Sequence, residues 1–244
     1  MTTASVPHLD EVVLRPVRGH HAFEACVEQL ATAMRLGVYP LGTVLPPERE
    51  LAERLEVSRA TLREAIAALR AAGFVETKRG RGGGTVVTMK PRGPSSRASG
   101  TTTAAQRADW LDALDFRRIV EPGAAAQAAG APLDEGARAR LEAAHAAVAR
   151  ATSRARHRQA DSRFHLTVAS LSGSGRTVAA VTSVQASLHE MLSAIPVLQT
   201  NIAHSDRQHE RILEAVLGGR PEQARRVMEE HCDDTAALLR GLLD

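Results

Sequence analysis

Apolar residues recur with helical spacing over three segments near the N-terminus of this chain. The pattern predicts helices over about residues 20–36, 48–55 and 59–72. Ser58 has the right chemistry to cap the start of the third helix, and Gly73 to end it. The three helices are short and follow one another closely.

Two strand-like runs follow the third helix, over residues 74–77 and 85–88. The segment between them, residues 78–84, reads KRGRGGG and combines basic residues with glycines. Two short strands separated by a Gly-rich segment predict a hairpin with a basic tip.

A segment rich in Pro, Gly, Ser and Thr interrupts the pattern at residues 90–103. Such a composition is typical of a linker between domains. We therefore expect one domain over residues 12–89, a linker over residues 90–104 and a second domain over residues 105–244.

The second domain has helical periodicity throughout, broken at Pro and Gly residues. The predicted helices cover approximately residues 106–129, 134–151, 154–171, 175–194, 201–217 and 221–242. The pattern predicts an all-α antiparallel bundle of six or seven helices, so the fold class of the whole chain is mainly α.

Composition refines this view only slightly. Aromatic residues make up 2% of the chain, so the core must be built mainly from Ala, Leu, Val and Ile. Cys26 and Cys232 match no metal or redox spacing, which is typical of a reducing cytoplasm. The first residues lack the long apolar run expected of a signal peptide, and no apolar run is long enough to span a bilayer. We therefore predict a cytoplasmic protein.

Basic charge is concentrated in the first part of the chain. Residues 1–97 hold 14 Lys and Arg against 10 Asp and Glu, whereas the remaining residues hold 17 against 18. This division suggests that only the first domain meets a polyanion.

The third helix has the pattern of a helix that reads DNA. Its apolar stripe, which should face the core, consists of Leu62, Ala65, Ile66 and Leu69. Arg59 and Arg63 lie on a neighbouring stripe near its N-terminus, with Thr61 beside them. Arginines at this end of a recognition helix can contact guanine edges or phosphates in the major groove. In the hairpin, glycines permit close approach to the DNA backbone and Lys78, Arg79 and Arg81 supply charge.

Several runs in the first domain resemble the winged helix-turn-helix of the GntR family: LPPERELA at residues 45–52, VSRATLREA at residues 57–65 and GFV at residues 73–75. The resemblance implies a fold of three helices and a β-hairpin wing. It also implies that Arg49, Arg59, Thr61, Arg63 and Gly80 contact a palindromic operator bound by a homodimer. The predicted DNA-contacting residues are Arg49, Ser58, Arg59, Thr61, Arg63, Lys78, Arg79, Gly80 and Arg81.

Polar residues lie on the apolar stripes of several helices in the second domain. His209 and His231 are each centred on such a stripe, and Asp161 and His165 share one helix face. A single histidine in this position is usually a hydrogen-bonded core residue, but three imidazoles and one carboxylate also make a plausible divalent-metal site. The pattern leaves both interpretations open.

The second domain is also similar to the FCD group of GntR regulators, through DSRFH at residues 161–165 and the residues around His209 and His231. The resemblance implies a divalent metal such as Zn, Ni or Mn bound by Asp161, His165, His209 and His231. It further implies that an organic acid binds near the metal and is met by Arg117. We add Glu121 and His189 to the predicted effector site.

Together these observations predict a metabolite-responsive transcriptional regulator, a repressor rather than an enzyme. Its partners would be a duplex operator, a small organic acid and a second copy of the chain, with no membrane. One alternative is a metal-dependent hydrolase with Glu121 as its general base. The other is an architectural DNA-binding protein that senses nothing.

Overall fold

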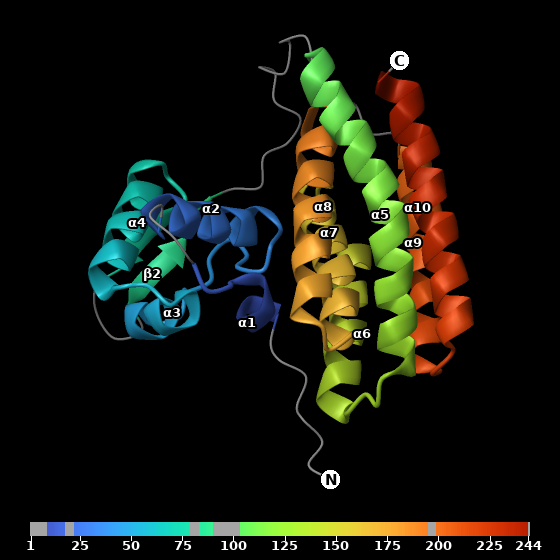
Figure 1. Ribbon diagram of the computed structural model, residues 1–244, viewed down its shortest axis with the longest axis horizontal. Coiled ribbons are helices and arrows are strands. Elements are labelled where there is room, and N and C mark those ends of the chain that lie inside the picture. The colour runs from blue at the N-terminus through green and yellow to red at the C-terminus, as the bar shows by residue number, and fades with distance from the viewer. Residues whose placement is uncertain (1–8, 18–21, 79–82, 90–102, 195–198, 244) are drawn as a thin grey trace. The chain divides into compact units, whose positions relative to one another are not determined.

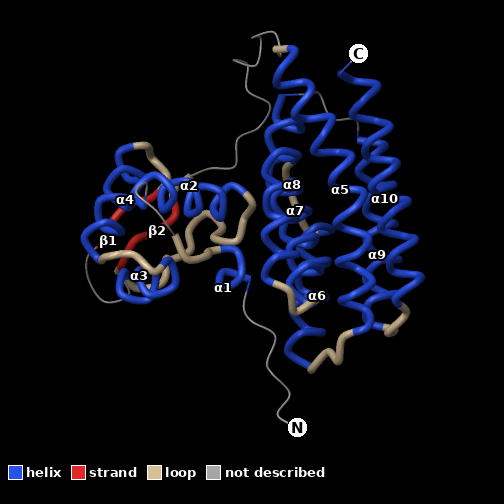
Figure 2. The backbone as a smooth tube through the Cα atoms, viewed as in Figure 1, coloured by secondary structure: helices blue, strands red, loops and turns tan. Residues whose placement is uncertain are grey.

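The computed structural model describes residues 9–17, 22–78, 83–89, 103–194 and 199–243. The chain divides into two compact units, one within residues 8–91 and the other within residues 92–244. Both strands belong to the first unit, and the second is helical (Figure 2).

The described residues of the first unit form four helices and one hairpin. Its elements are α1 (Leu9–Val13), α2 (Ala22–Arg35), α3 (Glu48–Leu55), α4 (Arg59–Ala71), β1 (Val75–Lys78) and β2 (Gly84–Val87). The strands pair antiparallel, with Val75 opposite Val87 and Lys78 opposite Gly84. The order of helices followed by a hairpin confirms the predicted winged helix-turn-helix fold.

Both ends of α4 form as the sequence predicts. The Ser58 hydroxyl accepts a hydrogen bond from the Thr61 backbone N–H at 3.0 Å, which caps the helix start. Gly73 follows the last turn with φ +77°, and the Phe74 N–H bonds back to the Leu69 carbonyl at 2.9 Å. Glycine adopts this left-handed conformation at little cost, so it ends the helix sharply.

Two local expectations need correction. The five-residue helix α1 was not predicted, because one turn is too short to display a period. The strands each lie one residue away from the predicted runs, and the predicted start of α2 at residues 20–21 lies outside the described residues.

The second unit is a bundle whose long helices pack side by side (Figure 1). In the described residues it comprises α5 (Ala104–Gly130), α6 (Glu135–Ala149), α7 (Arg154–Leu171), α8 (Gly175–Ala194), α9 (Gln199–Leu217) and α10 (Pro221–Leu243). Helix α5 contacts α7, α8, α9 and α10, so its inner face meets most of the bundle. No helix in the described ranges is sufficiently long and apolar to cross a membrane.

The bundle interior has two apolar clusters with polar residues between them. Leu114 of α5 belongs to the smaller cluster, which includes Trp110, and Ala125 belongs to the larger. Arg117 and Glu121, one turn apart, lie between these two residues along α5 and are both buried. We call this region the buried polar layer. Burying charged groups is costly unless they are paired, so the layer marks a place of chemical interest.

Candidate functional site

The predicted DNA-contacting arginines are exposed on the first unit. Arg59 and Arg63 lie in the first turns of α4, and Arg49 lies on α3. Arg63 Nε is 3.4 Å from a carboxylate oxygen of Glu48, and its side chain remains 67% exposed. Weak exposed pairs of this kind leave a guanidinium available to another anion.

The remaining predicted DNA contacts differ in their surroundings. Thr61 is half-buried, and its hydroxyl lies 2.8 Å from that of Ser58, so both residues also serve the helix cap. Lys78 is exposed at the end of β1. The predicted wing-tip residues Arg79, Gly80 and Arg81 lie outside the described residues.

Three helices bring their histidines together in the buried polar layer. His165 comes from α7, His209 from α9 and His231 from α10, and all three are buried. One nitrogen of each ring lies within 4.8 Å of the corresponding nitrogens of the other two. Residues separated by up to 66 positions therefore form one compact group, as the stripes predicted.

Oxygen atoms lie next to the Nδ1 atoms of two of these rings. His231 Nδ1 donates to the Gln208 side-chain oxygen at 3.1 Å. His165 Nδ1 lies 2.9 Å from a Glu121 carboxylate oxygen, close in distance although not aligned as an ideal hydrogen bond. Since the Gln208 oxygen requires a proton on Nδ1 of His231, the Nε2 atom of His231 carries a lone pair. An acceptor that fixes the far nitrogen of the ring is the usual support of a metal-binding histidine.

The His209 ring has the fewest hydrogen bonds of the three within the described residues. Neither nitrogen of His209 has a hydrogen-bond partner within the described part of the chain, and the side chain is fully buried. Its Nε2 lies 3.5 Å from the Asp161 carboxylate. Burial, together with nearby His165 and Arg117, holds the pKa of His209 well below its usual range. A neutral imidazole with a free lone pair is the form that binds a metal, so these residues fit a divalent cation.

Arg117 and Glu121 form a buried ion pair beside the histidines. Arg117 Nε lies 3.0 Å from the Glu121 carboxylate, and both side chains are only 2% exposed. Burial raises the pKa of Glu121, but Arg117, His165 and Gln185 together outweigh this effect and the pKa falls. Burial lowers the pKa of Arg117, but the nearby acidic groups, with Glu121 the largest contributor, together outweigh this effect and the pKa rises. Both groups are therefore charged.

The guanidinium of Arg117 also faces the histidines. Its Nη2 donates to His231 Nε2 at 3.0 Å and to His165 Nε2 at 3.4 Å. Its Nη1 is buried and has no hydrogen-bond partner among the described residues. A buried guanidinium with an unused donor is suited to receive a carboxylate.

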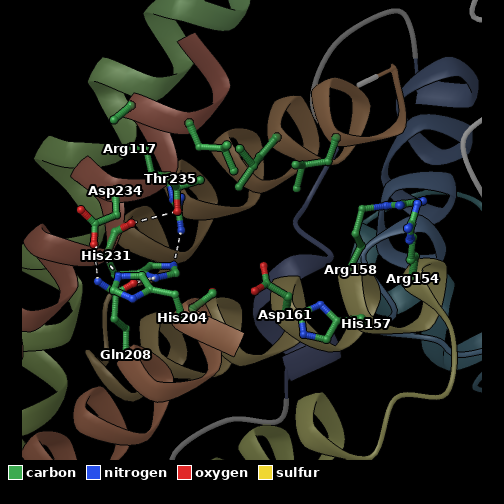
Figure 3. Close-up of a pocket in the computed structure, with 15 residues that line it drawn as sticks. Arg117, Arg154, His157, Arg158, Asp161, His204, Gln208, His231, Asp234 and Thr235 are labelled. Carbon is green, nitrogen blue, oxygen red and sulfur yellow. Dashed lines mark hydrogen bonds and ion pairs between the residues drawn. The ribbon is translucent and has the colours of Figure 1, made fainter. Parts of the chain in front are cut away.

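A cavity of about 330 Å³ opens beside this group (Figure 3). Arg117, Asp161 and His231 line one part of it. The other lining residues are Arg154, His157, Arg158, Leu188, Leu192, His204, Ser205, Gln208, Asp234, Thr235, Ala237 and Leu238. Its volume suits a small organic molecule.

Two residues predicted to bind the effector do not line this cavity. Glu121 lies behind Arg117, where it accepts a hydrogen bond from Gln185 at 2.6 Å. His189 is half-buried on α8, and within the described residues its neighbours Leu188 and Leu192 line the cavity instead. Glu121 therefore positions Arg117 and His165, because its oxygens already serve both of them.

The sequence pattern missed other cavity residues. The arginines at positions 154–158 have the composition of a solvated charge run, yet Arg158 is only 6% exposed and lines the cavity with Arg154. His157 and His204, which would be expected on the surface, also line it. Arg158 lies three residues before Asp161, a helical spacing that places the two on one face of α7.

Comparison with known proteins identifies both units. Residues 23–87 match the family model described as "Bacterial regulatory proteins, gntR family", and residues 112–234 match that described as "FCD domain". The chain is 33% identical over 220 residues to RmpR of Mycobacterium gastri, described as an HTH-type transcriptional regulator; the match covers 85% of this chain and 76% of that protein. It is 30% identical over 220 residues to the Glc operon transcriptional activator of Escherichia coli K12, covering 85% of each.

The fold also occurs among solved structures. The Escherichia coli protein McbR/YncC aligns with a TM-score of 0.54 and 15% identity, over 93% of this chain and 100% of that one. At this identity the likeness shows the fold alone.

Proposed function

Because the chain belongs to the GntR family of transcriptional regulators and carries its FCD effector-binding domain, we propose that it is a repressor controlled by a small organic acid. The first unit binds operator DNA, and the cavity of the second unit binds the acid. Exposed Arg59 and Arg63 at the start of α4, in a chain of this family, are the observation on which the proposal rests.

In this proposal α4 enters the major groove with its N-terminal turn. Arg59 and Arg63 contact base edges or phosphates, and Arg49 of α3 contacts the phosphate backbone of the DNA. Ser58 and Thr61 secure the helix start and present their hydroxyls to the DNA. In the wing, Lys78 and the predicted tip residues Arg79, Gly80 and Arg81 add phosphate contacts.

The protein acts as a homodimer on a palindromic site. Two equal reading units related by a twofold axis match the symmetry of an inverted repeat. Phe116 and Ile119 support this part of the proposal, because they are 42% and 74% exposed one turn apart on α5. Exposed large apolar side chains in one place often mark a protein interface.

The effector is a carboxylate held by Arg117, whose Nη1 donor is unused among the described residues. Asp161, His165, His209 and His231 would hold a divalent cation such as Zn, Ni or Mn. When bound, this metal would supply a Lewis acid that coordinates the carboxylate. Gln208 keeps the Nε2 atom of His231 free of a proton.

Effector binding is coupled to DNA binding through helix packing. The cavity is lined from α5, α7, α8, α9 and α10, so an acid bound there contacts most of the bundle. Binding that favours one packing of these helices shifts the pairing of the two copies, and the reading units lose their operator spacing. The acid therefore lowers operator affinity.

The two alternative functions find less support. A hydrolase would need an available general base, but the charge of Arg117 lowers the pKa of Glu121 and the carboxylate already serves Arg117 and Gln185. A purely architectural role does not require a ligand-sized cavity lined by Arg117 and His231. The relatives' names as transcriptional regulators also favour a non-enzymatic role.

Selection from random-sequence DNA duplexes tests the DNA-binding part. We expect the purified protein to enrich an inverted repeat, and replacement of both Arg59 and Arg63 by Ala to abolish the enrichment. Arg70→Ala is the matched control, because Arg70 is exposed at the opposite end of α4. Affinity for the selected duplex should fall steeply with salt, as phosphate contacts require. Undiminished binding by the double variant would refute the proposal.

A further inference from the structure

One stripe of α7 carries charged residues along the cavity and into the buried polar layer. Arg154, Arg158, Asp161 and His165 follow one another at intervals of three or four residues, which places them on one helix face. Arg158 and His165 are seven residues apart, a rise of about 10 Å along the helix. The arginines therefore lie well away from the histidine group.

This distant part of the cavity is strongly cationic. Arg154 and Arg158 both line it, and Figure 3 shows their guanidinium groups together, with Asp161 between them and His231. Burial and the charge of Arg154 lower the pKa of Arg158. Two like charges brought together at a partly dry surface are relieved when an anion binds between them.

Part of the cavity wall is apolar. Leu188 and Leu192 come from α8, and Leu238 from α10. The acidic Asp234 accepts hydrogen bonds from His204 at 2.8 Å and from Gln208 at 2.7 Å, so its charge is partly satisfied. The wall therefore suits a hydrocarbon segment more than a polar chain.

We propose that the effector is an elongated dianion, with one anionic group at Arg117 and the second held between Arg154 and Arg158, joined by an apolar segment that lies against Leu188, Leu192 and Leu238. This inference rests on the proposed carboxylate-sensing function and specifies the class of molecule sensed. Arg117 supplies a buried unused donor at one end, and Arg158, which is 6% exposed, supplies the other.

Calorimetric titration of the purified full-length protein tests this. The probes are unbranched dicarboxylates of four, six and eight carbons, each compared with the monocarboxylate of equal length. We expect one dicarboxylate to bind more tightly than its monocarboxylate by roughly ten- to a hundredfold, the effect of an added charge-assisted hydrogen bond. Arg158→Gln should remove this difference and leave monocarboxylate binding unchanged.

Two further variants control the experiment. Arg154→Gln changes an exposed residue and should also reduce the dicarboxylate preference, so the test does not depend on the buried position alone. Arg156→Gln should have no effect, because Arg156 is exposed on the same helix and does not line the cavity.

The outcomes separate the two proposals. Equal binding of mono- and dicarboxylates, or a preference that survives both Arg154→Gln and Arg158→Gln, overturns the dianion and leaves carboxylate sensing intact. Failure of every acid in both series to bind overturns the dianion and counts against the carboxylate effector as well.

Discussion

Glu121 illustrates how one buried residue supports several others. It pairs with Arg117 at 3.0 Å in a place where both side chains are 2% exposed. We expect Glu121→Gln to destabilise the second unit by about 3–5 kcal/mol, because it leaves the Arg117 charge buried without its partner. Urea unfolding followed by fluorescence measures this, since Trp110, the single tryptophan of the chain, is buried in the same helix.

An exposed ion pair between an arginine and a carboxylate provides the control for the unfolding of Glu121→Gln. Arg118 Nε lies 2.5 Å from Asp233, and both side chains are about half exposed. Asp233→Asn should change the free energy of unfolding far less than Glu121→Gln does, because water screens an exposed pair. Equal losses in the two variants would show that burial of the Arg117 pair has no special importance.

At the residue scale the sequence predicts the histidine group better than the cavity around it. The apolar stripes show that His165, His209 and His231 point inward, because an isolated polar residue among apolar neighbours is visible in one helix. The burial of Arg158 depends on how the other helices of the bundle pack around α7. The sequence of one charged helix segment does not show which other helices will pack against it.

At the scale of elements, the three histidines each come from a different helix. A metal bound by them and Asp161 would therefore join α7, α9 and α10. We expect Zn²⁺, Ni²⁺ or Mn²⁺ to raise the Tm of metal-stripped protein, with a stabilisation of about 2.7 kcal/mol when the free metal is at a hundred times its Kd. Thermal unfolding with and without the metal measures the shift.

His209→Ala should eliminate this metal-dependent shift. His145→Ala serves as the control, since His145 packs edge-on against Phe164 with ring centroids 5.9 Å apart but does not belong to the histidine group. A Tm rise of the same size in His209→Ala and the unmodified protein would mean that the metal binds elsewhere.

The elements themselves were largely predictable. The bounds of α3, α7 and α8 agree with the predicted ranges, because Pro, Gly and capping residues mark their ends in the sequence. The strands were one residue out, since a run of four residues contains too few alternations to establish its ends. The missed α1 has the same cause.

At the scale of the whole molecule, the proposed dimer predicts that the outer face of α5 forms the contact between the two copies. Phe116 and Ile119 are exposed there, and Ile119 is the more exposed at 74%. We expect Ile119→Glu to convert the dimer to monomers and to weaken operator binding, because a charge buried at an apolar contact loses its hydration. Light scattering after size-exclusion chromatography gives the mass in solution.

Glu142→Gln is a suitable control, as it alters an exposed residue on α6. If Ile119→Glu keeps the mass of the unmodified protein, the copies pair through another surface. A monomeric mass for the unmodified protein would refute the homodimer itself.

The stripe along α7 has a consequence for how such regulators diversify. The two proposed anchors, Arg117 on α5 and the Arg154 and Arg158 pair on α7, belong to one helical bundle, so the distance between them would select the ligand by its length. Moving an arginine of α7 by one helical turn would shift the second anion-binding position by about 5 Å, while the histidine group stayed in place. A descendant of this protein could thus come to sense a shorter or longer acid through a single relocation of charge.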